Sequence, residues 1–223
     1  MHVEALFIHD DTGRLVCINE PERRPAPRFY IGCAADGVVM RFRHDLEDEL
    51  VQSLEALCRE VVPEAGLTIP ARVSARIESL LAEVAPIERR WHGPVYRVPR
   101  NASEPSDAIA VTEVSADVLR PYLTEWLVDM TQSQPLVALV QNRRAVSLCC
   151  SGRRTPQAHE AAVETAAAFR GRGYGAQVVT KWAQAVAESG QIPLYSTSWE
   201  NVASRALAEK LGLIHYGSDM HLA

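Results

Sequence analysis

The sequence lacks the features that mark nucleic-acid-binding, membrane and secreted proteins. Its 23 basic and 28 acidic residues are interspersed without a run of like charge, which argues against a nucleic-acid partner. No apolar stretch approaches the length of a membrane span, and the N-terminus lacks the basic start and long apolar run of a signal peptide. We therefore expect a cytoplasmic protein with neither a nucleic-acid nor a membrane partner.

Cysteine is also scarce and shows no metal-binding pattern. The five cysteines are odd in number and scattered, so they predict reduced, mostly buried thiols and no metal site. What the chain has in quantity is apolar residues, at 47%, which is ample for a buried core in one large domain or two small ones.

The first part of the chain, residues 1–100, predicts a small α+β module. Short strands separated by turn signals are expected at residues 5–9, 15–18, 29–31 and 38–42. Apolar residues at helical spacing then predict an amphipathic helix from Asp45 to near Pro63 and a second helix from Val73 to Val84. A polar stretch without periodicity, at residues 99–107, predicts a linker.

Beyond the linker, in residues 106–223, predicted helices and strands alternate. This order predicts an α/β fold in which helices cover a mixed sheet and ligands bind at the ends of its strands. The strands are expected at residues 108–112, 136–140, 145–149, 159–167, 192–197 and 213–216, and the helices at residues 118–130, 174–188 and 201–211.

A glycine-rich loop connects the strand at residues 159–167 to the helix at residues 174–188. Gly171, Gly173 and Gly175 alternate, so the backbone can pass close to a ligand. Successive N–H groups can then converge on an anion, and the first turn of the helix adds its unpaired donors and its positive dipole end. A pyrophosphate fits this description, and Arg170 and Arg172 either add charge or are solvated surface residues.

The same letters also satisfy the dinucleotide-binding fingerprint through Gly171, Gly173 and Ala176, with Glu200 downstream as the ribose acid. Only 48 residues follow Gly175, however. That length holds a helix, a strand, a helix and a final strand, which is too little for the usual doubly wound nucleotide fold. Topology therefore disfavours a nicotinamide enzyme.

Two stretches carry a resemblance to a known family. Arg170, Gly173 and Gly175 resemble the arginine or glutamine, x, x, glycine, x, glycine or alanine signature of GNAT acetyltransferases. The stretch from Asn201 to Leu213, which contains Lys-Leu-Gly-Leu at its end, is similar to the family's asparagine-led helix and its leucine-glycine corner. The resemblance covers residues 108–216, and residues 195–201 look most like a bacterial branch of the superfamily.

This resemblance implies a mixed-sheet GNAT acyltransferase fold in the C-terminal half, preceded by the smaller α+β module. It also implies acetyl-CoA as cofactor, with its pantetheine arm along the strand near Glu164 and its pyrophosphate on the backbone amides of the loop. Amide groups of the arm can add to a strand edge as a peptide does, if the neighbouring strand splays away. The implied cofactor-binding residues are Val163, Thr165, Arg170, Gly171, Arg172, Gly173, Tyr174, Gly175, Asn201 and Ser204.

Acetyl transfer to an amine needs a base, and the strand before the loop offers candidates. Strand alternation puts His159 on the face of Val163 and Thr165, and Glu160 and Glu164 on the other face. Either Glu164 or His159 can remove the amine proton, and we favour Glu164 because histidine at a strand start is more often a surface or core residue.

The sequence departs from the family at the general acid. Where the family commonly has a tyrosine seven residues after the asparagine, this chain has Ala208. Ser204, Tyr216 or a water could protonate the leaving thiolate, or the thiolate leaves unassisted, because a thiol pKa near ~8.5 makes it a tolerable leaving group.

The predicted function is transfer of an acetyl group from acetyl-CoA to a primary amine by direct attack. A catalytically silent CoA-binding module is one alternative, which the missing tyrosine favours. A scaffold whose residues 1–100 recognise a partner protein is the other. The identity of the amine and self-association into a homodimer are left open.

Overall fold

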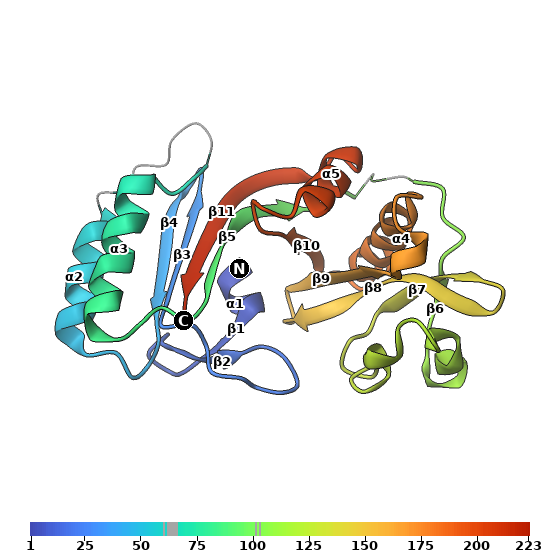
Figure 1. The fold of residues 1–223 in the computed structure, drawn as a ribbon, viewed down its shortest axis with the longest axis horizontal. Coiled ribbons are helices and arrows are strands. Elements are labelled where there is room, and N and C mark those ends of the chain that lie inside the picture. The colour runs from blue at the N-terminus through green and yellow to red at the C-terminus, as the bar shows by residue number, and fades with distance from the viewer. Residues whose placement is uncertain (60, 62–66, 101, 103) are drawn as a thin grey trace. The chain divides into compact units, whose positions relative to one another are not determined.

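The computed structural model describes residues 1–223 except 60, 62–66, 101 and 103. The chain folds into two compact units that interleave along the sequence (Figure 1). The predicted division into domains 1–100 and 106–223 stays a prediction about independently folding parts. No helix in the described part of the chain is long and apolar enough to cross a membrane. Unit 1 comprises Met1–Ala5, Arg97–Tyr195 and Val202–Ile214, and unit 2 comprises Leu6–Tyr96, Ser196–Asn201 and His215–Ala223.

Unit 2 is built on antiparallel strands covered by two helices. β3 (Phe29–Ala34) pairs with β4 (Gly37–Phe42) on one side and with β11 (Ile214–Leu222) on the other, and β5 (Arg90–Arg97) is next to β11 in the strand order. Helices α2 (Asp48–Arg59) and α3 (Ala71–Val84) lie over one face of these strands (Figure 1). A separate two-stranded antiparallel sheet consists of β1 (Phe7–His9) and β2 (Leu15–Ile18).

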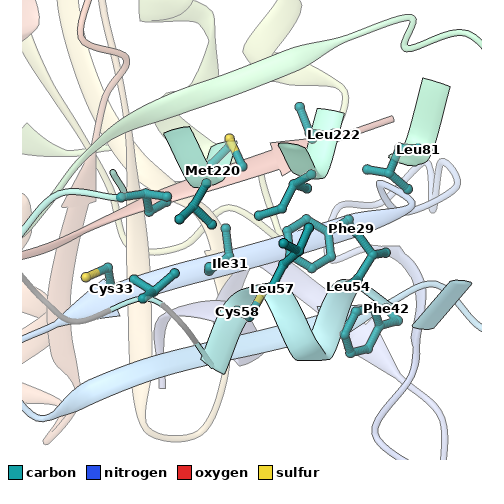
Figure 2. Packing of buried hydrophobic residues seen from close by; sticks show 14 of the residues in the cluster. Phe29, Ile31, Cys33, Phe42, Leu54, Leu57, Cys58, Leu81, Met220 and Leu222 are labelled. Atoms are coloured by element: carbon teal, nitrogen blue, oxygen red, sulfur yellow. The ribbon is translucent and has the colours of Figure 1, made fainter. Parts of the chain in front are cut away.

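The core of unit 2 lies between these helices and strands. Alternation along β3 turns Phe29, Ile31 and Cys33 toward the helices, where all three are buried (Figure 2). Leu54 of α2 and Leu81 of α3 are fully buried in the same cluster. Burying one such side chain contributes about 1.5–3 kcal/mol relative to leaving it in water, so this cluster is a main source of stability for unit 2.

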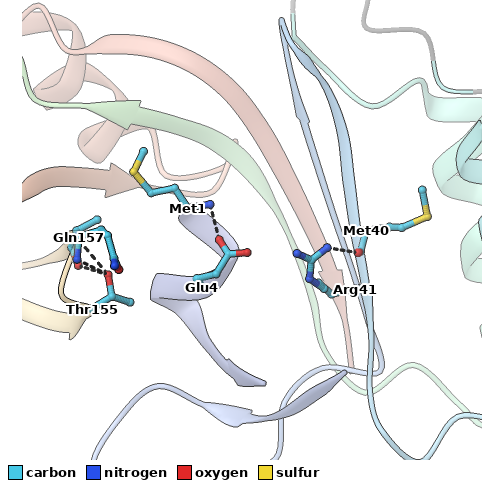
Figure 3. Close-up of polar contacts among 7 residues, drawn as sticks. Met1, Glu4, Met40, Arg41, Thr155 and Gln157 are labelled. Atoms are coloured by element: carbon cyan, nitrogen blue, oxygen red, sulfur yellow. Dashed lines mark hydrogen bonds and ion pairs between the residues drawn. The ribbon is translucent and has the colours of Figure 1, made fainter. Parts of the chain in front are cut away.

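The start of the chain corrects the predicted strand at residues 5–9. Ala5 belongs to a short helix, α1 (His2–Leu6), and only Phe7–His9 form a strand. The turn closes because the Ala5 N–H donates to the Met1 carbonyl oxygen at 3.2 Å, and the Met1 amino group forms an ion pair with Glu4 (Figure 3). These local bonds outweigh the β tendency of the apolar residues that follow.

The sequence analysis did not predict β5, and it placed the ends of α2 elsewhere. Gly93 and Pro94 of β5 resemble turn residues, but Gly93 serves a close backbone approach instead. A Cβ atom at Gly93 would lie 1.8 Å from the carbonyl oxygen of Thr197, so a side chain cannot be accommodated there. α2 begins at Asp48 rather than Asp45, and its predicted end near Pro63 lies outside the described residues.

Unit 1 contains five neighbouring strands. In their order in the sheet they are β10 (Ile192–Ser196), β9 (Ala158–Thr165), β8 (Arg144–Arg154), β7 (Leu136–Gln141) and β6 (Ile109–Ala110). One face of its sheet packs against α4 (Tyr174–Glu188), whose Val178, Val179 and Trp182 are buried. The segment with two short 3-10 helices, η1 (Glu113–Leu119) and η2 (Thr124–Leu127), lies on the opposite face of the sheet from α4 (Figure 1). The pairs β6–β7, β7–β8 and β8–β9 are antiparallel. β10 pairs parallel with β9.

The helix predicted at residues 118–130 is wrong. Two short 3-10 helices, η1 (Glu113–Leu119) and η2 (Thr124–Leu127), stand in its place. Between them lies Pro121, which lacks an N–H donor and disfavours the helical conformation at the residue before it. Arg120 is accordingly extended, with φ −82° and ψ 143°. Leu119, Leu123 and Met130 are nevertheless buried under the sheet, so the apolar pattern reports burial rather than a continuous helix.

The segment predicted as a linker has no helix or strand among its described residues, and Asn101 and Ser103 lie outside them. It is nonetheless attached to unit 1. The Val98 N–H donates to the Pro193 carbonyl oxygen at 3.0 Å, and the Ser106 hydroxyl donates to the Gln177 carbonyl oxygen at 3.0 Å. Polar composition therefore did not mean a detached segment.

Candidate functional site

The glycine loop of unit 1 has the backbone conformation that the sequence predicts. Gly171 and Gly173 have φ values of +75° and +77°, which L side chains rarely adopt. Gly173 is the N-cap of α4 in the left-handed region, and α4 begins at Tyr174 as predicted. The first N–H groups of a helix have no acceptor within the helix, so the start of α4 presents donors and a positive dipole end.

The third glycine of the loop lies beneath helix α5 (Val202–Lys210). A Cβ atom at Gly175 would lie 2.7 Å from Leu207 Cδ1, and one at Gly173 would lie 3.5 Å from Lys210 Nζ. Leu207 and Lys210 are three positions apart and therefore share a face of α5. That face borders the loop, and the missing side chains leave a cradle of backbone amides.

Strand β9 offers a free edge next to this cradle. β10 pairs with β9 only from Ile192↔Ala158 to Leu194↔Glu160, although β9 continues to Thr165. Among the described residues, Ala161–Thr165 therefore have no pairing with β10 on that side. An extended chain of amide groups can form hydrogen bonds with such an edge. The strand splay that the resemblance requires is present.

The residues therefore fit a CoA-type cofactor. An open strand edge could bind its amide-bearing arm, and the glycine loop that comes after the strand could bind its pyrophosphate.

Both loop arginines are exposed and are held by backbone carbonyls. Arg170 Nε donates to the Thr165 oxygen at 3.0 Å, and Arg172 Nη2 donates to the Ala168 oxygen at 3.2 Å. The Arg172 guanidinium also lies over the Phe169 ring at 5.4 Å. Either arginine can turn toward an anion at little cost.

The other predicted cofactor residues near the loop are held by side-chain hydrogen bonds. Gln141 Nε2 of β7 donates to the Tyr174 hydroxyl at 2.6 Å, which fixes the first residue of α4. Thr165 and Ser147 share a hydroxyl hydrogen bond of 2.8 Å at the end of β9. Val163, two residues earlier on the same face, is partly buried.

Glu164 lies on the face of β9 opposite α4, and it has one strong donor. Trp126 Nε1, from η2, donates to Glu164 Oε2 at 2.8 Å. Glu164 is partly buried, and a carboxylate has lone pairs for more than one donor. A partly buried carboxylate held in one orientation can accept a proton from an amine that binds at this edge.

His159 lies on the α4 face, in a different environment. Its side chain is buried, and its Nδ1 lies 2.8 Å from the Ser151 hydroxyl, which accepts a hydrogen bond from Trp182 Nε1 at 3.1 Å. Burial lowers the pKa of His159, and Arg154 lowers it further. The imidazole is therefore neutral near pH 7 and joins β8, β9 and α4. Glu160, on the Glu164 face, forms a 3.3 Å ion-pair contact with His2.

The two predicted site residues near α5 fall in different units. Asn201 is exposed, immediately precedes α5 and belongs to unit 2, as does Tyr216. Ser204 belongs to unit 1, and its Oγ lies 2.6 Å from the hydroxyl of the buried Tyr195. Ala208, one turn after Ser204 on α5, is buried. A hydroxyl pair therefore stands one turn from the position where the family has its tyrosine.

Sequence reasoning missed Trp126, Tyr195 and Lys210 as members of this site. Trp126 is 38 positions from Glu164, and no local pattern links the two. Tyr195 and Ser204 are nine positions apart on a strand and a helix, so their contact depends on how α5 packs. Lys210 lies in the stretch from Asn201 to Leu213 that resembles the family. A cationic residue in that stretch was the one local signal that could have pointed to an anion site.

Comparisons with known proteins agree with this geometry. Residues 137–217 match the GNAT acetyltransferase family model, a stretch that contains the loop, α4 and α5. A GNAT-family acetyltransferase from Colwellia psychrerythraea is 12% identical with a TM-score of 0.51, over 90% of this chain and 82% of that chain. A GNAT-family protein from Novosphingobium aromaticivorans is 17% identical with a TM-score of 0.51, over 61% of this chain and 65% of that chain, so the match spans just under two thirds of its length. No curated protein matches the sequence.

Proposed function

We propose that the chain, whose residues 137–217 match the GNAT acetyltransferase family model, transfers an acetyl group from acetyl-CoA to a primary amine by direct attack. The family supports an acyltransferase function, and the acetyl donor and amine acceptor are the proposal. The observation that carries it is the end of β9–β10 pairing at Glu160, which leaves residues 161–165 of β9 without a β10 partner on the strand that leads to the glycine loop. A strand edge and an anion cradle in sequence suit a ligand that is an amide chain with a pyrophosphate at its end.

The cofactor would be held by backbone rather than by side chains. Edge groups of Val163 and Thr165 would take the pantetheine amides, and the amides of Gly171, Gly173 and Gly175 would take the pyrophosphate. When bound, the cofactor supplies a thioester whose carbonyl carbon accepts the amine. The loop glycines have the left-handed conformation without a bound ligand, so the cradle is already formed in this structure.

Glu164 is the proposed base. Its position on the face opposite α4, and the fixed hydrogen bond from Trp126, support this role over His159. The His159 imidazole is buried and bonded to Ser151, within the contact between the sheet and α4. A proton taken by Glu164 would leave the amine nitrogen with the free electron pair that the attack needs.

The pair formed by Ser204 and Tyr195 is the proposed proton donor for the leaving thiolate. Ser204 lies one turn before the buried Ala208 on α5, and the Tyr195 hydroxyl at 2.6 Å can replace the proton that Ser204 gives away. Tyr216 belongs to unit 2, so the pair within unit 1 is the better supported of the candidates.

The cofactor assignment is tested by thermal unfolding. Acetyl-CoA should raise the Tm, because a ligand at 100 times its Kd stabilises the native state by about 2.7 kcal/mol, and NADH should not. Gly173→Glu and Gly175→Glu should each abolish the shift by placing bulk and negative charge in the cradle. Gly190→Glu is the matched control, since Gly190 also has a positive φ, +86°, but lies beyond the other end of α4. A shift with NADH alone would overturn the proposal.

Turnover is tested separately, with a panel of amines and a free-thiol readout. Release of CoA that depends on an added amine is the expected result. The absence of a tyrosine at Ala208 favours a second candidate, a CoA-binding module without turnover. Binding of CoA with no thiol release from any amine would support that second candidate.

A further inference from the structure

A third cation, Lys210, borders the cradle, and its ammonium group is already paired with a carboxylate. Lys210 Nζ lies 2.7 Å from Glu104 Oε1, in the segment that precedes β6. Arg170 and Arg172, in contrast, donate to backbone carbonyls. Among these three cations, within the residues that the structure describes, only Lys210 is in an ion pair.

Lys210 also lies beside the centre of the loop. Its Nζ would lie 3.5 Å from a Cβ atom at Gly173, the N-cap of α4. Its backbone position is fixed, because Leu207 of the same α5 face lies against Gly175. Glu104 lies two residues before Ser106, whose hydroxyl donates to the Gln177 carbonyl oxygen of α4 at 3.0 Å.

We propose that Lys210 binds a phosphate group of the CoA-type cofactor and that Glu104 competes with that phosphate for the same ammonium group. This inference rests on the proposed cofactor site. The side chains of Lys210 and Glu104 are 48% and 29% exposed, so water and salt weaken their ion pair and an arriving phosphate can displace the carboxylate. Glu104 thus sets the cofactor affinity through its competition with the phosphate.

The test measures cofactor binding by isothermal titration calorimetry at low salt. Lys210→Ala should weaken CoA binding about tenfold, the usual size of one charge-assisted contact. Glu104→Gln should strengthen it about two- to fivefold, because an exposed ion pair is worth at most about that much. The double variant should bind as Lys210→Ala does, since Glu104 acts only through the lysine.

Two matched controls separate this competition from general charge effects. Glu209→Gln removes an exposed carboxylate beside Lys210, and Lys181→Ala removes an exposed lysine from α4. Neither should change CoA binding more than about twofold. If Glu104→Gln and Glu209→Gln act alike, or Lys210→Ala binds CoA as Lys181→Ala does, the proposal is wrong.

Dephospho-CoA and S-acetylpantetheine identify the phosphate. A loss in Lys210→Ala for both CoA and dephospho-CoA assigns the contact to the pyrophosphate, whereas a loss for CoA alone assigns it to the 3′-phosphate. S-Acetylpantetheine has no phosphate, and an equal loss with it would overturn the proposal. If the wild-type protein binds no CoA at all, the proposed function fails; normal binding without coupling between Lys210 and Glu104 defeats only this inference.

Discussion

Unit 2 covers its strands with two regular helices, whereas unit 1 covers one face with α4 and the other with two short 3-10 helices. In unit 2, Leu54 of α2 and Leu81 of α3 belong to the same buried apolar cluster as Phe29 of β3. In unit 1 the irregular cover places Trp126 at the end of β9, beside Glu164. Regular cover buries apolar area efficiently, and irregular cover leaves the end of a strand and its polar groups within reach of a ligand.

The two units also differ in where they hold polar groups. Unit 1 buries the chain of Trp182, Ser151 and His159 between α4 and the sheet. It also keeps Gly171 and Gly173 in left-handed conformations at the exposed loop. We therefore expect unit 1 to carry the proposed chemistry, and we expect substitutions in the core of unit 2 to affect stability. Four predictions test that division, beginning with the largest effect.

Glu164→Gln should lower turnover by roughly two to four orders of magnitude, the usual contribution of a positioned base. It should leave acetyl-CoA affinity unchanged, because the backbone edge of β9 is the same. His159→Ala is the comparison, and steady-state rates and calorimetric affinities on any accepted amine decide between them. An unimpaired Glu164→Gln enzyme beside a crippled His159→Ala enzyme would reverse the assignment.

Leu54→Ala should destabilise the protein by about 2–5 kcal/mol, because a fully buried leucine in unit 2 leaves a cavity when it is truncated. CoA affinity at 10 °C should stay within about twofold of wild type, since the cradle belongs to unit 1. Urea unfolding and calorimetry provide the two measurements, with the exposed Gln52→Ala on the same helix as control. A parallel loss of CoA binding in the folded variant would end the proposed division of roles.

The stability of both units should fall as the pH is lowered below about 6.5. Burial lowers the pKa of His159 in unit 1 and of His92 in unit 2 from the ordinary value of 6.5. The unfolded chain therefore takes up each proton at a higher pH than the folded chain. Stability is complete above about pH 6.5 and declines until the folded pKa is reached, by at most about 1.4 kcal/mol per pH unit and proton.

Urea unfolding at pH 7.5 and 5.5 measures this decline. His159→Gln should reduce the difference between the two pH values, and His92→Gln should reduce it by a similar mechanism in unit 2. The exposed His44→Gln serves as control and should leave the difference unchanged. An undiminished pH dependence in His159→Gln would mean that its burial in the folded state is not what opposes protonation.

The smallest effect concerns the thiols. All five cysteines are buried, which confirms the predicted burial of the thiols. Burial raises the pKa of Cys58 in unit 2 and of Cys150 in unit 1 to about 12. A thiol-specific reagent at pH 7.5 should therefore label neither cysteine until its unit opens. The order of labelling in urea, read by mass spectrometry, reports which unit opens first, and rapid labelling of Cys150 in the native state would contradict the packing.

Prediction from the sequence succeeded where the signal is local. The helix at residues 174–188 and the strand at residues 15–18 have the predicted bounds, because apolar period and glycine signals act within one element. It failed at residues 118–130, where Pro121 interrupts the helix but the apolar spacing continues. It also missed β5, because glycine is typical of turns, whereas Gly93 lies within a strand and allows a close approach of the backbone.

The sequence by itself determined the glycine loop and its resemblance to the family whose model residues 137–217 match. Glycine adopts the positive φ of Gly171 and Gly173 without steric cost, whereas other residues do so rarely, and the glycine letters therefore indicate the conformation. The tertiary structure alone decided which side chains surround the cradle. The Glu164 carboxylate accepts a hydrogen bond from Trp126, which is 38 positions away, and Lys210 forms an ion pair with Glu104, which is 106 positions away. Such pairs depend on the register of strands and the packing of α5, and neither leaves a trace in the residues that lie next to each other in the chain.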